Sequence, residues 1–163
     1  MSDDHSVFDA EVNAFVDWCD SHHLDLNVSK TKEMVIDYRR KNKTDAPPCV
    51  IKGQTVERVG VYKYLGTIVD DKLSFHENTQ AIHTKCRQRL NILFQLRSFM
   101  VSSKILQRCY NAYIQSVLTF SIVCWFGSVT GKERMKLNGI VSLCEKVIGI
   151  KLDRLATVYN DRT

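Results

Sequence analysis

The chain has 163 residues, of which 44% are hydrophobic and 25% charged, and its formal net charge is +5. This length suits one domain or two small subdomains, and seven Gly and two Pro are too few for a largely disordered protein. The longest apolar-leaning run, residues 117–127, is shorter than the roughly 20 residues that span a bilayer. The acidic N-terminus does not resemble a signal peptide. We therefore expect an intracellular protein, nuclear or cytoplasmic, that does not bind membranes.

Charge is distributed unevenly along the chain. The first 27 residues contain seven acidic residues and no Lys or Arg, so all basic residues lie from Lys30 onward. This distribution favours a polyanionic partner. The six cysteines form no CxxC pair and match no zinc-site spacing. We therefore expect buried, reduced thiols and no metal site.

The first predicted element is an amphipathic helix that begins near Ser6 and ends near His22. Its apolar residues recur at helical spacing, and its acidic residues mark the opposite face. The predicted buried stripe consists of Phe8, Val12, Phe15 and Cys19.

A region of predicted strands follows the helix. Alternating apolar residues predict a strand over residues 34–38, before a basic loop over residues 39–43. Gly53-Gln54 lies between two short β-rich runs and predicts a tight hairpin. Residues 61–69 are β-branched and aromatic and predict a strand, in which Gly66 marks a bulge or a close approach.

Three helices are predicted after the strands. Residues 74–77 and 130–133 have the capping-box pattern, Ser102 or Ser103 can begin the helix between them, and Gly149 ends the last one. Residues 151–163 show no period and are expected to fray. The order of elements predicts an α+β fold. The predicted apolar stripes are Ile82, Cys86, Leu90 and Leu93, then Leu106, Cys109, Tyr110, Tyr113 and Val117, and finally Leu137, Val141, Cys144 and Ile148.

Three motifs, in order, resemble segments of LINE-type (non-LTR) retrotransposon reverse transcriptases. Trp18-Cys19 followed by LDLNVSKTKEM (residues 24–34) resembles the palm segment downstream of the catalytic residues. YKYLGT (residues 62–67) resembles the hairpin that grips the primer end, and residues 89–127 resemble thumb helices. The resemblance covers roughly residues 8–150. It implies a partial palm over residues 1–73, made of a helix, antiparallel strands and the primer-grip hairpin, then a three-helix thumb-like bundle over residues 74–150 and a tail over residues 151–163.

The resemblance also bears on activity. The family is an RNA-directed DNA polymerase that holds two Mg²⁺ ions with an early Asp and an Asp-Asp pair. The one early candidate here, Asp3-Asp4, follows Met1-Ser2 rather than an aromatic-x pair and lies too close to the first helix. We therefore expect a catalytically silent remnant that lacks its upstream palm segment, holds no cofactor and is not an enzyme by itself.

Four residues carry over from the family motifs. Lys30 matches a lysine that acts as a general acid toward the departing pyrophosphate, although without a bound nucleotide it is a solvated turn lysine. Tyr64, Leu65 and Gly66 match the primer grip, where a glycine lets a phosphate approach the backbone. An ordinary half-buried strand explains these three residues equally well.

Two basic patches extend this interpretation to nucleic acid. Lys85 and Arg89 are four residues apart on the first predicted thumb helix, and Arg39 and Arg40 lie in the basic loop. Such patches can follow the phosphates of an RNA template or DNA primer weakly and non-specifically. Alternatively, both patches are ordinary solvent-exposed charged surfaces without a binding role.

A second resemblance gives an alternative function. Residues 102–138 resemble a short helical segment at the N-terminus of AlkB-homologue tRNA hydroxylase/methyltransferases. This implies an interaction or structural module without an oxygenase or methyltransferase core. His23-Leu24-Asp25 also matches the H-x-D of iron oxygenases, with His76 or His83 as the distant ligand. The predicted strands are too few for the double-stranded β-helix of those enzymes, so we expect no iron site.

Overall fold

The computed structural model describes residues 3–38 and 47–163, with side chains from residue 6 onward. It contains both helices and short strands and is therefore a mixed α+β chain. The chain divides into two compact units, residues 1–62 and 63–163, and the boundary lies within strand β5. We call them the N-terminal unit and the C-terminal unit and describe each by itself.

No helix in the described part of the chain is long and apolar enough to cross a membrane.

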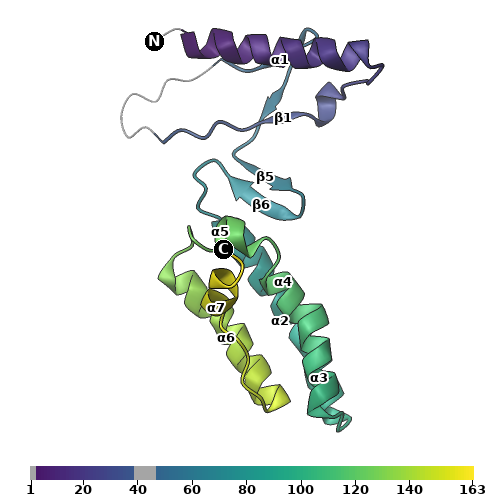
Figure 1. Ribbon diagram of the computed structural model, residues 1–163, viewed down its shortest axis with the longest axis vertical. Helices are drawn as coiled ribbons and strands as arrows, with labels where there is room; N and C mark the ends of the chain where they lie inside the picture. Colours follow the sequence, from purple (N-terminus) through teal and green to yellow (C-terminus); the bar gives the residue numbers. More distant parts are fainter. Residues whose placement is uncertain (1–2, 39–46) are drawn as a thin grey trace. The chain divides into compact units, whose positions relative to one another are not determined.

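The N-terminal unit consists of one long helix and short paired strands (Figure 1). Strands β1 and β4 pair in parallel, and β2 and β3 pair antiparallel. A small core of Val16, Cys49, Ile51 and Val56 joins the helix to the strands. The elements are α1 (Asp3–Ser21), the 3₁₀ turn η1 (Val28–Lys30), β1 (Lys32–Glu33), β2 (Val50–Ile51), β3 (Gln54–Thr55) and β4 (Glu57–Arg58).

The predicted hairpin in this unit is confirmed, but its turn lies one residue earlier than expected. The reversal occurs at Lys52-Gly53, between β2 and β3. Both residues have positive φ, +49° and +75°, as the type I′ turn of two-residue hairpins requires. Gly53 accommodates this conformation without steric cost.

The predicted first helix is confirmed and ends at Ser21, close to the expected His22. The predictions of its start, of its buried stripe and of a strand over residues 34–38 are wrong. Residues 34–38 form no strand, because pairing with the two-residue strand β4 ends at Glu33. The first helix begins at Asp3 rather than near Ser6. Of its predicted apolar stripe only Cys19 is buried, while Phe8 and Phe15 are about half exposed, since the small core reaches α1 mainly through Val16.

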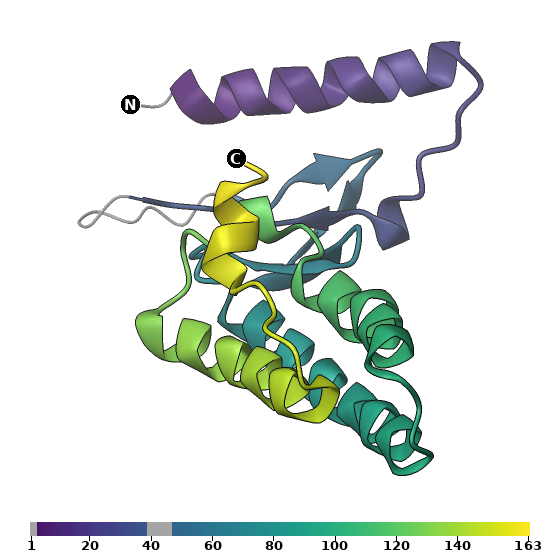
Figure 2. The same ribbon diagram turned by 60° about the horizontal axis from the view of Figure 1, so that its bottom comes forward.

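The C-terminal unit begins with a hairpin and continues as a helical bundle (Figure 1). Segments α3, η2 and α4 follow one another as one rod beside α2, and α6 packs against another side of α2. Figure 2 shows the short α7, in yellow, beside α6. The elements are β5 (Val61–Tyr64), β6 (Thr67–Asp70), α2 (His76–Ser98), α3 (Ser103–Tyr110), the π-helical segment η2 (Asn111–Gln115), α4 (Ser116–Leu118), α5 (Ile122–Trp125), α6 (Gly131–Ile148) and α7 (Leu155–Asn160).

The predicted single strand over residues 61–69 is wrong. The chain reverses at Leu65-Gly66, where φ is +46° and +96°, and β5 pairs with β6 as a hairpin. Gly66 is thus a turn residue rather than a bulge, whereas the predicted close approach at this position is confirmed, because a Cβ there would lie 3.0 Å from the Phe120 ring. The hairpin contacts α2, where Asn78 Oδ1 accepts a hydrogen bond from the Ile68 backbone N–H at 3.1 Å. Most of the hairpin therefore clusters with the helices.

The capping box predicted at residues 74–77 is wrong as well. Phe75 precedes α2 in a left-handed conformation, and its side chain makes no capping hydrogen bond. Instead, the Asp70 carboxylate accepts hydrogen bonds from the backbone N–H groups of Lys72, Ser74 and Phe75. Burial opposes ionisation of Asp70, but these donors outweigh it and lower its pKa. A carboxylate at the end of the hairpin thus shapes the entry into α2.

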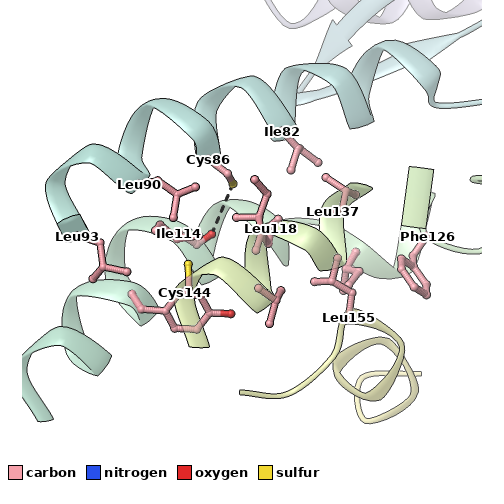
Figure 3. Packing of buried hydrophobic residues seen from close by; sticks show 14 of the residues in the cluster. Ile82, Cys86, Leu90, Leu93, Ile114, Leu118, Phe126, Leu137, Cys144 and Leu155 are labelled. Atoms are coloured by element: carbon pink, nitrogen blue, oxygen red, sulfur yellow. Dashed lines mark hydrogen bonds between the residues drawn. The ribbon is translucent and has the colours of Figure 1, made fainter. Parts of the chain in front are cut away.

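The helical core follows the predicted stripes of α2 and α6, whose residues are all buried (Figure 3). In the rod, Leu106 and Tyr110 are buried, whereas Tyr113 is half exposed.

Burial raises the pKa of Cys86 and Cys144 to about 12, so both thiols are protonated at neutral pH. All six cysteines are free, four are buried, and Cys124 is exposed.

The frayed tail predicted for residues 151–163 is wrong. Residues 155–160 form α7, and Leu155 is only 2% exposed. The Glu145 carboxylate accepts hydrogen bonds from the Leu152 backbone and the Arg154 guanidinium. The Tyr159 ring packs against Phe126. These tertiary contacts order a helix too short to show a period of its own.

Leu155→Ala is expected to destabilise the C-terminal unit by about 2–5 kcal/mol, because it removes a fully buried side chain from the core. Leu65→Ala is the matched control, since Leu65 is 79% exposed and its substitution should change stability by less than about 0.5 kcal/mol. Urea unfolding followed by helical circular dichroism measures both effects. Equal stabilities for the two variants would show that α7 does not pack as described.

Candidate functional site

The C-terminal unit contains a long segment without acidic residues. Residues 78–132 include no Asp or Glu and seven basic residues. This segment covers nearly all of α2 and every element up to the start of α6. Its formal charges are therefore all positive, a composition that favours anionic partners. The basic residues are Lys85, Arg87, Arg89, Arg97, Lys104, Arg108 and Lys132.

A concave surface lies within this unit, between the hairpin, α2 and the C-terminal end of the rod. Its volume of about 340 Å³ is at the small end of ligand pockets, which hold roughly 300–1,000 Å³. We call it the hairpin groove. It is lined by Lys63, Gly66, Ile68, Asn78, Ala81, Ile82, Lys85, Ser116, Val117 and Phe120.

The groove brings together two of the residues singled out from the sequence, Gly66 and Lys85. Tyr64 and Leu65 are exposed on the same hairpin but do not line the groove. Arg89 donates through Nη1 to the Tyr113 carbonyl at 2.6 Å, so its guanidinium braces η2.

The remaining sequence candidates lie elsewhere. Lys30 ends η1 in the N-terminal unit and is exposed. Its backbone N–H donates to the Asn27 side chain. Arg39 and Arg40 lie outside the described residues. The described part of the chain contains no group of three or more His, Cys, Asp or Glu residues that could hold a metal ion.

Gly66 has a structural role in the groove. A Cβ at this position would lie 3.0 Å from Cε1 of Phe120, and the φ of +96° is strained for any other residue. The Phe120 ring therefore lies directly against the turn of the hairpin. About half of Phe120 remains exposed, which leaves part of an aromatic surface available at the groove.

Asn78 is the polar group of the groove that sequence reasoning missed. It is only 4% exposed, and its Oδ1 accepts from Ile68 N–H. Its Nδ2 has no hydrogen-bond partner among the described residues. A buried donor left in this state costs about 1–3 kcal/mol. One feature of the sequence could have pointed to Asn78: Asn is a weak helix former, and here it occupies a helical position.

The π-helical segment η2 positions the other wall of the groove. Segments of this kind are rare and frequently occur at functional sites. Two side chains of α2 face carbonyls of η2, Arg89 at Tyr113 and Cys86 at Ile114. This bracing fixes the start of α4, from which Ser116 and Val117 line the groove.

A second cavity of about 260 Å³ lies where α2 and α6 begin. Its principal charged group is Glu133, which is buried. Oε1 is 2.8 Å from His76 Nδ1 and accepts from Thr79 Oγ1 at 2.9 Å. Oε2 accepts from the Thr130 backbone N–H at 2.9 Å and from Thr130 Oγ1 at 2.7 Å. The capping box predicted at residues 130–133 is therefore confirmed.

These contacts define the chemistry of the second cavity. Burial opposes ionisation of Glu133, but the hydrogen bonds from Thr130, His76 and Thr79 outweigh it and lower its pKa to about 2. Both carboxylate oxygens are occupied by side chains of the protein. The arrangement therefore joins two helices rather than presenting a free acid or base to a substrate.

Comparison with known proteins gave no match: no family model, no curated protein and no solved structure is detectably similar to this chain.

Glu133→Gln is expected to destabilise the C-terminal unit at pH 7 by about 1.5–3 kcal/mol, the value of hydrogen bonds to a charged group. The folded-state pKa of about 2 lies below the ordinary value of 4.5. The stabilisation is therefore complete above pH 4.5 and is lost as the pH falls toward 2. Urea unfolding at several pH values should show a flatter pH dependence for the variant across this window.

Glu77→Gln is the control for this experiment, because Glu77 is an exposed residue in the first turn of α2. It should keep the wild-type pH dependence. A Glu133→Gln variant with wild-type stability at pH 7 would mean that the helix-joining network contributes nothing to the fold.

Proposed function

We propose that this chain is a catalytically silent remnant of a LINE-type RNA-directed DNA polymerase that retains weak, sequence-independent binding to nucleic acid. The observation that carries the proposal is the acid-free segment 78–132, which contributes Lys85 to a groove that also contains Lys63 and Phe120. Lysines beside an exposed aromatic ring are the combination that binds nucleic-acid strands without sequence preference.

The expected affinity follows from the electrostatics. Each phosphate that a lysine neutralises releases counterions, so binding weakens as salt rises. Nucleic-acid binding of this kind typically has a Kd of about 10⁻⁴ to 10⁻⁶ M at physiological salt. None of the groove-lining residues is acidic, so no carboxylate there opposes a phosphate.

The palm and thumb assignments belong to this proposal. The β5–β6 hairpin takes the place of the primer grip, and its exposed Tyr64 and Leu65 face solvent at the turn. Helix α2, the rod and α6 take the place of the thumb helices. Arg39 and Arg40 form a second basic patch in the sequence.

The proposal excludes polymerisation on the basis of where the Asp-Asp pairs lie. The sequence has two such pairs, Asp3-Asp4 and Asp70-Asp71. Asp70 accepts hydrogen bonds from the turn before α2 and is committed to that turn. Asp3-Asp4 lies at the start of the helix α1. Lys30 then has no metal-bound nucleotide on which to act.

Lys63→Gln/Lys85→Gln is expected to weaken binding to a fluorescent oligonucleotide, because it removes both cations of the groove. The slope of log K against log salt is negative, and it should become less negative by about 0.7 for each lysine that contacts a single strand. Fluorescence anisotropy at several salt concentrations measures both quantities. Lys104→Gln/Lys132→Gln is the matched control, since it removes the same charge from exposed positions outside the groove.

The control variant should retain most of the affinity. Equal losses of affinity in the two variants would place binding outside the groove, and binding that does not depend on salt would contradict an electrostatic mode altogether.

Primer extension on an RNA template with Mg²⁺ should give no product with the wild-type chain. Template-dependent extension would overturn the assignment of a silent remnant.

A further inference from the structure

We infer that the turn between α2 and α3 (residues 99–102) binds the surface of an anionic lipid bilayer and inserts Phe99 and Met100 into it. The inference is independent of the proposed function, because this turn lies outside the hairpin groove. It departs from the expectation, drawn from the sequence, that the chain does not bind membranes. That expectation rested on the absence of a spanning segment and of a signal peptide, and binding to a bilayer surface requires neither.

The α2–α3 turn is closed by backbone hydrogen bonds. The Met100 N–H donates to the Arg97 carbonyl at 3.0 Å. The Val101 N–H donates to the Leu96 carbonyl at 3.4 Å. These two bonds form the Schellman motif, in which a contact between the apolar residues at the positions of Val101 and Leu96 is common. Both residues also pack against the helical core, so the turn presents its outward side chains from an ordered backbone.

The outward side chains are not explained by the fold. Met100 has a φ of +55°, a conformation that glycine usually supplies at this position of the motif and that is an outlier for a bulky residue. Met100 is also 92% exposed and Phe99 is 78% exposed. Glycine at position 100 would relieve the backbone, and a polar residue at position 99 would keep the surface hydrophilic. Two adjacent apolar side chains that the core does not use therefore indicate a contact outside the chain.

Exposed basic residues lie on the helix ends next to the turn. Ser103 Oγ donates to the Ile148 carbonyl at 2.8 Å, which brings the end of α6 to the end of the bundle that carries the turn (Figure 1). Two acidic residues lie at this end. Glu145 accepts hydrogen bonds from two other residues, and Asp153 is exposed. The exposed basic residues are Arg97, Lys104, Arg108, Lys146 and Lys151, so positive charge is in excess.

The combination of projecting apolar side chains and basic neighbours favours an anionic bilayer over other partners. Apolar side chains enter the boundary between headgroups and acyl chains, while lysines and arginines bind the anionic headgroups. A nucleic acid would match the charge, but methionine offers no ring on which a base could stack. A second copy that presented the same turn would bring like charges together. An acidic protein is the alternative that the experiments below distinguish.

Co-sedimentation of the intact chain with sucrose-loaded vesicles tests the choice of partner. The chain should bind phosphatidylcholine vesicles that contain about one-third phosphatidylserine, and this binding should weaken as salt rises. It should bind vesicles of phosphatidylcholine alone about tenfold more weakly or not at all. Equal binding to both kinds of vesicle, or no binding to the anionic ones, would overturn the inference, and the second result would leave an acidic protein as the partner.

Met100→Gly separates binding from folding. Glycine adopts a φ of +55° without strain, so the variant should melt at or above the wild-type temperature. Its affinity for the anionic vesicles should nevertheless fall by about tenfold, because it has lost one inserted apolar side chain. Met135→Ser is the control, since Met135 is 70% exposed on α6 between Lys132 and Lys136 and should not affect binding. Met100→Gly that binds as tightly as wild type would contradict insertion.

A measurement on the wild-type chain shows whether Met100 enters the bilayer. The sequence has four methionines, and the ¹³C-methyl signal of Met100 is identified by its loss in Met100→Gly. Spin-labelled lipids in anionic bicelles should broaden this signal more than that of Met135. Equal broadening of the two signals would mean that the turn does not insert, and would overturn the inference. Met100→Gly should still bind oligonucleotides like wild type, so a failure here is distinguishable from a failure of the proposed function.

Discussion

The carboxylate of Glu133 joins the beginnings of two helices, and the architecture of the C-terminal unit depends on this contact. Glu133 lies in the first turn of α6 and bonds His76 and Thr79 in the first turn of α2, so the two helices run in parallel. Their N-terminal ends, each carrying a partial positive charge, are therefore adjacent. The buried carboxylate offsets that charge. At the opposite end, Ser103 Oγ donates to the Ile148 carbonyl and fixes the start of the rod to the end of α6.

This arrangement explains why a groove forms where it does. One side of α2 is covered by α6, and another is covered by the rod, whose π-helical segment is braced by Arg89. The hairpin packs near the start of α2, where Asn78 binds its backbone. The acidic groups that stabilise the helix beginnings, Asp70 and Glu133, have their oxygens engaged there. The lining of the groove contains two lysines and no acidic residue.

Sequence reasoning succeeded where a feature depends on residues within one element. The apolar stripes of α2 and α6, the Thr130 cap and the end of α6 at Gly149 are local patterns of this kind. It failed where distant residues determine the outcome. Asp70 rather than Ser74 organises the entry into α2, tertiary contacts order α7, and the role of Asn78 follows from a hairpin ten residues away. Such contacts have no periodicity and leave no signal in a single sequence.

The most direct test of a nucleic-acid site in the C-terminal unit is ultraviolet cross-linking of the intact chain to a thiothymidine-containing single strand, followed by peptide mapping. Cross-links form only where a base lies against a side chain, so they locate the site without any substitution. We expect them on peptides that contain residues 63–66 and 116–120, which border the hairpin groove, and we expect them to decrease as salt rises. Cross-links confined to residues 1–62, or none at low salt, would contradict the placement of the site and the function proposed for it.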